Sequence, residues 1–349
     1  MHYSPIKFKP IFKQRIWGSD RLKRLFNKDL PPDKPIGECW ELADLPDDKS
    51  KIAEGPMAGM DIRQLLDEHG PALGFADEQC KFPFGLLIKF LDANDVLSVQ
   101  VHPDDKTSRM FAGARHKTEF WYVLEAEPNS VIYRGLKPQV NREKLTESLN
   151  EGNIEKLMNV YPARKGDFHF LPAGTVHALG SGVVVAEIHT PSDTTYRLYD
   201  WNRKDSRGHS RELHIEQALA SIHYSNSDYP PADNNIIGLS AVASTLTNIG
   251  NSLGKAKLLL ECPYFSVVHV SYESGLREFS SGIPCVMIAL SGNGDIYNKD
   301  DLDGHCGYNA GDTMLIPAIR AGGLNAGQAG ELLLVCLAPP TKVKGRLTF

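Results

Sequence analysis

Polar and apolar residues alternate over short segments of this chain rather than in long helical stripes. Most apolar runs span four to eight residues and are bounded by glycine, proline or other turn-forming residues, a pattern typical of β-strands. Many short strands separated by turns favour a mostly β sandwich or jelly roll. The predicted strands are 85–93, 96–102, 118–126, 130–135, 166–172, 183–190, 195–200, 257–262, 265–272, 285–292, 313–317 and 331–338.

Three segments show apolar residues at helical spacing instead. Residues 61–70 predict a helix that stops at Gly70-Pro71, and residues 141–161 predict two short helices separated at Gly152. Residues 211–224 predict a further helix. The helical pieces are therefore small additions to a β protein.

A segment rich in Ser, Asn, Pro and Gly divides the strands into two groups. We expect residues 1–225 to form a first domain, residues 226–256 a connection, and residues 257–349 a second β domain. A length of 349 residues suits two domains.

Composition narrows the function classes. Charged residues make up 23% and hydrophobic residues 42%, as in folded globular proteins. The net charge of -5, without a basic stripe, argues against nucleic-acid binding. We see neither an 18-residue apolar stretch nor the apolar core of a secretory signal, and the six cysteines are scattered without a CxxC pair. We expect a cytoplasmic protein that acts on a small molecule and binds no membrane.

The segment 97–105 (LSVQVHPDD) carries candidate chemistry. Side chains alternate along a strand, so Ser98, Gln100 and His102 share one face while apolar residues occupy the other. Gln100 and His102 are thus within reach of one bound ion. The alternative is an exposed polar strand face without a ligand.

A second candidate is 166–177 (GDFHFLPAGTVH), which predicts a strand, a tight turn and a return that aims His177 into the sheet interior. Between the two segments, Glu119 opens a strand at a distance that suits a third ligand. A lone histidine after a turn is otherwise a satisfied polar residue.

Several motifs in order carry a resemblance that covers residues from about 5 to about 220. They are Trp17-Gly18, Ile36-Gly37-Glu38-Cys39-Trp40-Glu41, Phe84 to Asp92, Gln100-Val-His102-Pro-Asp-Asp, Lys117-Thr-Glu119, Pro172-Ala-Gly174-Thr-Val-His177, Glu187 and Ser192-Asp193-Thr-Thr-Tyr-Arg197. This ordered set resembles the class I (cupin-type) mannose-6-phosphate isomerases, and the chain length resembles their short bacterial type.

The resemblance implies a cupin jelly roll with a metal site formed by Gln100, His102, Glu119 and His177. Two imidazoles, one carboxylate and one amide oxygen suit Zn²⁺, with Mn²⁺, Co²⁺ and Fe²⁺ as substitutes. It also implies interconversion of mannose 6-phosphate and fructose 6-phosphate by proton transfer between C1 and C2 through a cis-enediol. The partner is therefore a hexose phosphate, and the sequence does not indicate the oligomeric state.

Further roles follow from the resemblance. Arg197, Lys89 and Lys117 are expected in the active site, where cations contact the substrate or assist proton transfer. Substrate-binding positions are Ser98, Arg203, Glu41 and Trp17, with Ser98 and Arg203 at the phosphate. Glu187 is the candidate base and Glu41 the alternative base.

Some of these residues also have simpler interpretations that involve no role in the active site. Lys89 could extend its ammonium to the surface, and Arg203 could be an ordinary surface cation. His169 and His189 lie near the ligand segments and could support them rather than bind metal.

The second domain lacks the complete motif found at 166–177. Residues 309–320 (NAGDTMLIPAIR) repeat the Gly-Asp and Pro of that motif, but no histidine follows the proline at the spacing of His177. We expect a metal-free, jelly-roll-like domain with a structural role.

Two other functions remain open from the sequence alone. An Fe²⁺-dependent cupin oxygenase could use the same ligands. A sugar-phosphate-binding cupin without turnover is the other alternative.

Overall fold

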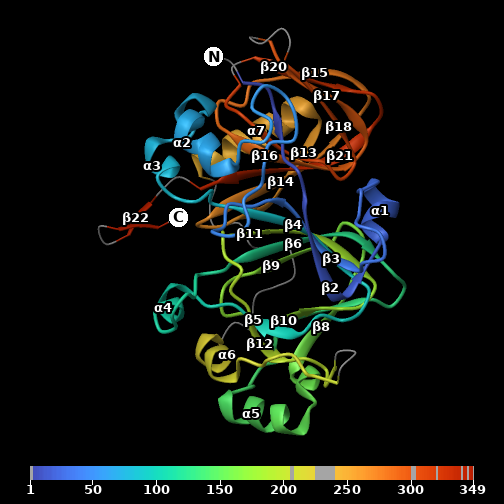
Figure 1. Ribbon diagram of the computed structural model, residues 1–349, viewed down its shortest axis with the longest axis vertical. Coiled ribbons are helices and arrows are strands. Elements are labelled where there is room, and N and C mark those ends of the chain that lie inside the picture. The colour runs from blue at the N-terminus through green and yellow to red at the C-terminus, as the bar shows by residue number, and fades with distance from the viewer. Residues whose placement is uncertain are drawn as a thin grey trace.

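Four β-sheets stacked one on another form the body of the molecule (Figure 1). The computed structural model describes residues 3–204, 208–224, 240–299, 304–319, 321–338, 341–343 and 346–348. We call the two sheets nearer the N-terminus in sequence the N-terminal barrel and the other two the C-terminal barrel. In Figure 1 the C-terminal barrel, orange to red, lies above the N-terminal barrel.

The N-terminal barrel consists of one six-stranded and one five-stranded sheet, with every pair of neighbours antiparallel. In spatial order the first sheet contains β2 (Ile11–Ser19), β3 (Ile36–Leu42), β4 (Leu87–Ala93), β11 (Val183–His189), β6 (Glu119–Ala126) and β9 (Phe168–Leu171). The second contains β12 (Tyr196–Tyr199), β5 (Val99–Val101), β10 (His177–Leu179), β7 (Val131–Leu136) and β8 (Met158–Pro162). Apolar side chains from both sheets, such as Trp121 and Ile132, meet between them.

The C-terminal barrel repeats this plan with a six-stranded and a four-stranded sheet. The larger contains β1 (Ile6–Lys7), β19 (Thr313–Ile316), β16 (Cys285–Ser291), β21 (Gly330–Leu337), β14 (Phe265–Tyr272) and β13 (Lys255–Glu261). The smaller contains β15 (Gly275–Phe279), β20 (Gly322–Ala326), β17 (Asn293–Asn298) and β18 (His305–Asn309). A hairpin, β22 (Thr341–Val343) and β23 (Arg346–Thr348), follows.

The two barrels share a continuous apolar layer. Buried residues of the N-terminal barrel, including Phe90 and Phe120, belong to the same cluster as Phe265, Val267 and Val335 of the C-terminal barrel. In addition, strand β1, which lies at the N-terminal end of the sequence, pairs with β19 of the C-terminal barrel. The two domains therefore fold against each other rather than standing apart.

The helices cover the ends and sides of this stack (Figure 1). Their bounds are α1 (Arg21–Phe26), α2 (Ile62–Leu73), α3 (Asp77–Cys80), α4 (Asp105–Ser108), α5 (Arg142–Glu151), the 3-10 helix η1 (Ile154–Leu157), α6 (Ile215–Ser221) and α7 (Ala241–Leu253). Helices α5 and α6 close the outer face of the five-stranded sheet with Leu145 and Leu219. No described helix has both the length and the apolar character needed to cross a membrane.

The mostly β class and the cupin fold are confirmed, and each predicted strand overlaps an observed one. Three predicted segments differ from the structure. The second short helix expected within 141–161 is the 3-10 helix η1, and strand β8 takes up the rest of that segment from Met158. The helix expected over 61–70 continues through Pro71 to Leu73, which is fully buried, and ends at Gly74 with φ 96°. The expected connection 226–256 contains α7, which packs on the C-terminal barrel, while residues 225–239 lie outside the described part.

Candidate active site

The neighbouring strands β5 and β10 bring Gln100, His102 and His177 to one point between the sheets of the N-terminal barrel. Strand β5 pairs with β10 so that Gln100 lies opposite His177. The turn before β10 passes so close to the ring of His223 that a Cβ on Gly174 would lie 2.5 Å from it. Gly174 also has φ 86°, a conformation that favours glycine. Its amide donates to the carbonyl of His102 at 2.9 Å, which fixes the turn against the neighbouring segment.

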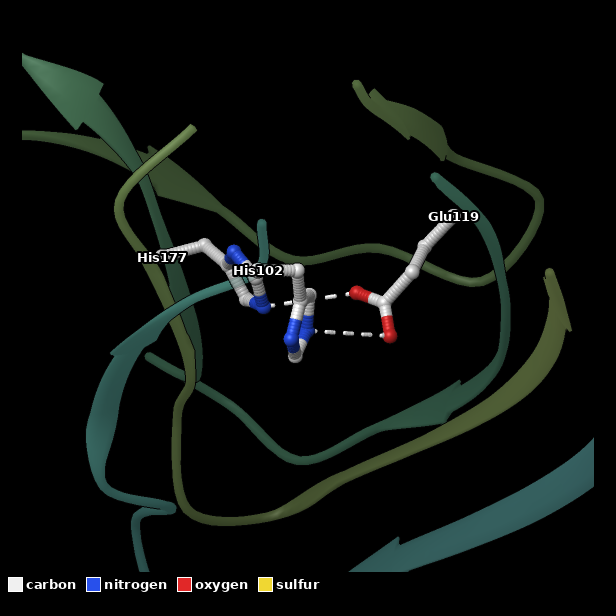
Figure 2. A group of neighbouring side chains, drawn as sticks. All are labelled: His102, Glu119 and His177. Atoms are coloured by element: carbon white, nitrogen blue, oxygen red, sulfur yellow. Dashed lines mark ion pairs between the residues drawn. The ribbon is translucent and has the colours of Figure 1, made fainter. Parts of the chain in front are cut away.

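Figure 2 shows His102, Glu119 and His177 pointing toward one another. The Nε2 atom of His102 lies 3.2 Å from Oε1 of Glu119, and Nε2 of His177 lies 3.3 Å from Oε2. All three side chains are almost completely buried. The side-chain amide of Gln100 approaches Nε2 of His177 at 3.2 Å, so a fourth polar group reaches the same centre.

His102 and His177 each turn an unprotonated ring nitrogen toward the centre of this group. Nδ1 of His102 bonds the carbonyl of Thr194, and Nδ1 of His177 bonds the carbonyl of Thr175, both at 2.9 Å. A carbonyl accepts only from N–H, so both Nε2 atoms remain as acceptors. Burial lowers the pKa of His102 to about 4 and also lowers that of His177, so both imidazoles are neutral near pH 7.

A cation fits this donor set. Nε2 of His102 and both carboxylate oxygens of Glu119 are buried without a hydrogen bond, and the cation beside them is Lys117, 2.6 Å from Oε1 of Glu119. Acceptors that converge without protons between them repel unless a positive ion lies among them. The ligand atoms of the three residues lie within 4.8 Å of one another. This group could therefore hold a metal ion, and two imidazoles with a carboxylate match the ligands of zinc.

A lysine borders the group on its open side. Nζ of Lys117 lies 2.6 Å from Oε1 of Glu119, and both side chains are buried. Burial on its own would raise the pKa of Glu119, but His102 and Lys117 hold it well below its usual range. Glu119 is therefore ionised, which a metal ligand requires.

Lys89 lies in a second charged cluster on the adjoining strands. Its ammonium lies 3.1 Å from Asp193 and 3.5 Å from Glu38, and it sits 4.4 Å from the centroid of the Trp40 ring. Burial alone would lower the pKa of Lys89, but the surrounding carboxylates raise it above its usual range. Its side chain is only 3% exposed, so the alternative in which Lys89 reaches the surface is wrong.

Glu187 joins the two clusters. Its carboxylate accepts from Nε1 of Trp121 at 2.9 Å and lies 3.9 Å from the ammonium of Lys89. Nε2 of His189 approaches it at 3.3 Å. Burial and Glu119 each raise the pKa of Glu187, but Lys117 and the contact with His189 lower it to about 2. Glu187 is thus a buried carboxylate that remains ionised across the neutral range.

Lys89, Gln100, Lys117 and Glu187 line a cavity of about 410 Å³, a volume in the range of small-molecule sites. His102, Glu119 and His177 are not among the lining residues and reach the cavity only through their contacts with Gln100 and Lys117. Five cationic side chains against three carboxylates make this lining suited to an anion. The lining consists of Arg15, Trp17, Glu38, Lys89, Leu91, Leu97, Ser98, Gln100, Lys117, Glu187, Asp193, Thr195, Arg197 and Arg211. Seven of the predicted site residues are in this set: Trp17, Lys89, Ser98, Gln100, Lys117, Glu187 and Arg197.

Two other predicted residues lie elsewhere. Arg203 bonds Asp200 and Asp95 and also the carbonyl of Val96, and it is absent from the cavity lining. Glu41 points to the opposite face of β3, where Lys28 and Cys39 bond its carboxylate. The structure therefore does not bring Arg203 or Glu41 to the cavity.

The sequence-based predictions did not include four charged residues of the lining, Arg15, Glu38, Asp193 and Arg211, in the site. Glu38 and Asp193 both contact Lys89, and Glu38 also bonds Arg15 at 2.6 Å. Arg211 is held by Asp200. Glu38 and Asp193 both lie inside motifs that carry the resemblance, 36–41 and 192–197, and these motifs could have indicated them.

Comparison with known proteins agrees with this geometry. Residues 6–134 match the family model described as phosphomannose isomerase type I, catalytic domain. The probable mannose-6-phosphate isomerase GmuF of Bacillus subtilis (strain 168) is 33% identical over 318 residues, which are 90% of this chain and 93% of that protein.

Solved structures share the whole fold. The crystal structure of the mannose 6-phosphate isomerase from Bacillus subtilis superposes with a TM-score of 0.81 at 29% identity, covering 95% of this chain and 99% of that one. A more distant structure, a mannose 6-phosphate isomerase bound with zinc and yttrium, has a TM-score of 0.70 at 16% identity and covers 96% of this chain and 100% of that one. At that identity the likeness concerns the fold alone.

Proposed function

The chain belongs to the type I phosphomannose isomerase family, and from this membership we propose that it interconverts mannose 6-phosphate and fructose 6-phosphate. The observation that carries the proposal is the buried His102–Glu119–His177 group, whose neighbours Gln100 and Lys117 line a cavity rich in cations. An aldose–ketose isomerase needs a base that moves a proton between C1 and C2, and groups that stabilise the negative charge of the enediol(ate).

Zinc is the proposed metal, held by Gln100, His102, Glu119 and His177. When bound, it would supply a Lewis acid that stabilises negative charge on sugar oxygens. The donor set of two nitrogens and two oxygens, without thiolate, supports zinc, with Mn²⁺, Co²⁺ and Fe²⁺ as substitutes. The histidines' bonds to backbone carbonyls fix which ring nitrogen faces the ion.

Glu187 is the proposed base. It is ionised at neutral pH, is buried, and faces the cavity. In the aldose-to-ketose direction its carboxylate would take the proton from C2 and return it to C1, while the hydroxyl proton moves from the oxygen on C2 to the oxygen on C1. Trp121 donates a hydrogen bond that holds the carboxylate in place, and Lys89 beside it can stabilise negative charge on the sugar oxygens.

The substrate phosphate is proposed to lie at the end of the cavity formed by Arg197, Arg211 and Ser98. Nε of Arg197 is buried without a hydrogen-bond partner. Burial lowers the pKa of Arg197, and the nearby charge of Arg211 repels its guanidinium and lowers the pKa further. A dianionic phosphate would relieve this repulsion and accept several charge-assisted hydrogen bonds.

The other two functions are less well supported. An oxygenase acting on a neutral substrate has no use for Lys89, Lys117 and Arg197 around one cavity. A binding protein without turnover does not need an ionised carboxylate buried beside them. The family relatives are named as isomerases, which agrees with turnover.

A cytoplasmic location is part of the proposal. All six cysteines are free thiols, five of them buried. Unpaired thiols are usual in reducing compartments.

The test is a coupled isomerase assay of metal-analysed protein with a panel of hexose phosphates. We expect mannose 6-phosphate to be converted, with the corresponding glucose and galactose phosphates converted far more slowly. Lack of product from every hexose phosphate would refute the proposed activity. Oxygen uptake on adding Fe²⁺ and substrate would favour the oxygenase instead.

A further inference from the structure

Lys117 lies at the end of a long connection between β5 and β6 that includes only one short helix, α4. Backbone and hydroxyl contacts tie this connection to the segment that carries Asp193. The amide of Arg115 donates to Thr194 Oγ1 at 3.1 Å, and Ser192 Oγ donates to the carbonyl of Arg115 at 3.1 Å. The amide of Lys117 itself donates to the carbonyl of Pro103 at 3.1 Å, and the contacts of its neighbours add to the support of its position.

One of these neighbours contacts the C-terminal barrel. The ring of His116 lies 4.6 Å, centroid to centroid, from the ring of Tyr264, with an angle of 41° between the planes. Tyr264 lies in the turn between β13 and β14, and its carbonyl accepts from the amide of Ala338 at 2.9 Å, just after β21. Two strands of the C-terminal barrel thus hold the ring that packs on His116.

The contact continues from His116 into the site. Nε2 of His116 hydrogen-bonds Thr118 Oγ1 at 2.9 Å. The same oxygen accepts from the amide of Ala173 at 3.1 Å, in the turn that precedes His177. Tyr264 is therefore linked, through the side chains of His116 and Thr118, to the turn before His177. Lys117 lies between His116 and Thr118 in the sequence, and its ammonium is 2.6 Å from Glu119.

From this arrangement we infer that Tyr264 is a positioning residue of the isomerase site: its ring holds His116, and His116 holds Lys117 against Glu119. The inference rests on the proposed function and gives the C-terminal barrel a role in it. None of the described residues of this barrel lines the cavity, and its contribution is to fix the connection from which Lys117 extends. A misplacement of about 1 Å in a catalytic group can cost up to about 10²-fold in rate.

The first test compares Tyr264→Ala with Tyr264→Phe in the full-length, zinc-loaded protein, well below its unfolding temperature. We expect Tyr264→Ala to lower kcat roughly 10- to 100-fold, with KM for mannose 6-phosphate within about threefold and zinc still at one per chain. Tyr264→Phe keeps the ring and should retain most of kcat. A loss of zinc in Tyr264→Ala, or an equal loss of kcat in both variants, would contradict the inference.

Leu324→Ala is the matched control. Leu324 is fully buried inside the C-terminal barrel. Its truncation weakens that barrel without touching the His116 contact, so kcat should be unchanged while the unfolding temperature falls. If Leu324→Ala lowered kcat as much as Tyr264→Ala, the effect would reflect general loosening of the domain and the positioning role would be wrong.

The second test asks whether Tyr264 acts through Lys117. In a Lys117→Met background, Tyr264→Ala should change the residual kcat by less than about twofold, because the group that it positions has gone. The same factor in both backgrounds would refute the positioning role and leave the proposed function standing. If the wild-type protein itself converted no hexose phosphate, the proposed function would fail and the inference with it.

Discussion

The two barrels have the same plan of paired antiparallel sheets and differ in what lies between the sheets. The N-terminal barrel encloses charged and polar side chains, among them His102, Glu119 and Glu187. The C-terminal barrel encloses an apolar core that includes Ile296, Leu324 and Leu334. Among the described residues, only the N-terminal barrel contains a group of three side chains able to hold a metal ion.

This difference shows how one architecture serves two purposes. Buried charges cost free energy unless each is paired or binds an ion, so a barrel filled with them contributes less to stability than an apolar one. The apolar layer shared by the two barrels lets the C-terminal barrel support its neighbour. The chemistry can then lie in one barrel while the other supplies packing energy.

The largest expected effect comes from removing a ligand in the polar barrel. His102→Ala should abolish zinc binding and lower kcat/KM by roughly 10³-fold or more, because a metal ion contributes several kcal/mol to stabilising the developing charge. Zinc content by metal analysis and turnover by coupled assay check this. Full turnover from a zinc-free variant would show that the ligand assignment is wrong.

Next in size is the loss of the proposed base. Glu187→Gln keeps the shape and can still accept from Trp121, so zinc should remain bound while kcat falls by about 10²- to 10³-fold, as for loss of general base catalysis. The measurement is steady-state kinetics with parallel metal analysis. Unchanged kcat would move the role of base to another carboxylate of the cavity, such as Asp193 or Glu38.

The two arginines near Asp200 should differ from each other. Arg211 lines the cavity, whereas Arg203 is bonded to Asp95 and Asp200 outside it. Arg211→Ala should lower kcat/KM for mannose 6-phosphate by roughly 10- to 100-fold, as for loss of a charge-assisted hydrogen bond. Arg203→Ala is the matched comparison and should have a smaller effect. A larger loss in Arg203→Ala than in Arg211→Ala would instead favour Arg203, the residue that the resemblance implies, as the phosphate contact.

A smaller effect concerns stability against acid. Burial, with the charge of Arg134, lowers the pKa of His169 in the N-terminal barrel to about 3, whereas in an unfolded chain it lies near 6.5. The unfolded state therefore binds one more proton between these values, and stability falls as the pH falls below about 6.5. Wild type should lose up to about 2 kcal/mol more than His169→Phe between pH 6.5 and 5, measured by chemical denaturation. Equal losses in the two proteins would contradict this account.

Much of the site could be predicted because its residues follow local rules. Gln100 and His102 alternate with buried valines, and His177 follows a turn that needs Gly174. The strands with clean alternation were predicted as well. The four-stranded sheet was missed because each of its strands contains glycine, which disfavours strand assignment.

The rest of the site depends on tertiary structure. Strand β3 is buried on both faces, so no polar alternation distinguishes the face of Glu38 from the face of Glu41. Arg15 and Arg211 lie far apart in sequence and meet only at the cavity. The contact between Tyr264 and His116 joins two domains, and no sequence pattern records it.

The most direct test of the central claim is a zinc titration of the metal-stripped wild-type protein, followed by turnover of mannose 6-phosphate. We expect turnover to rise in proportion to added zinc and to saturate at one zinc per chain, because among the described residues only the N-terminal barrel contains a group able to hold a metal ion. Turnover by the zinc-free protein, or saturation only at two zinc ions per chain, would contradict it.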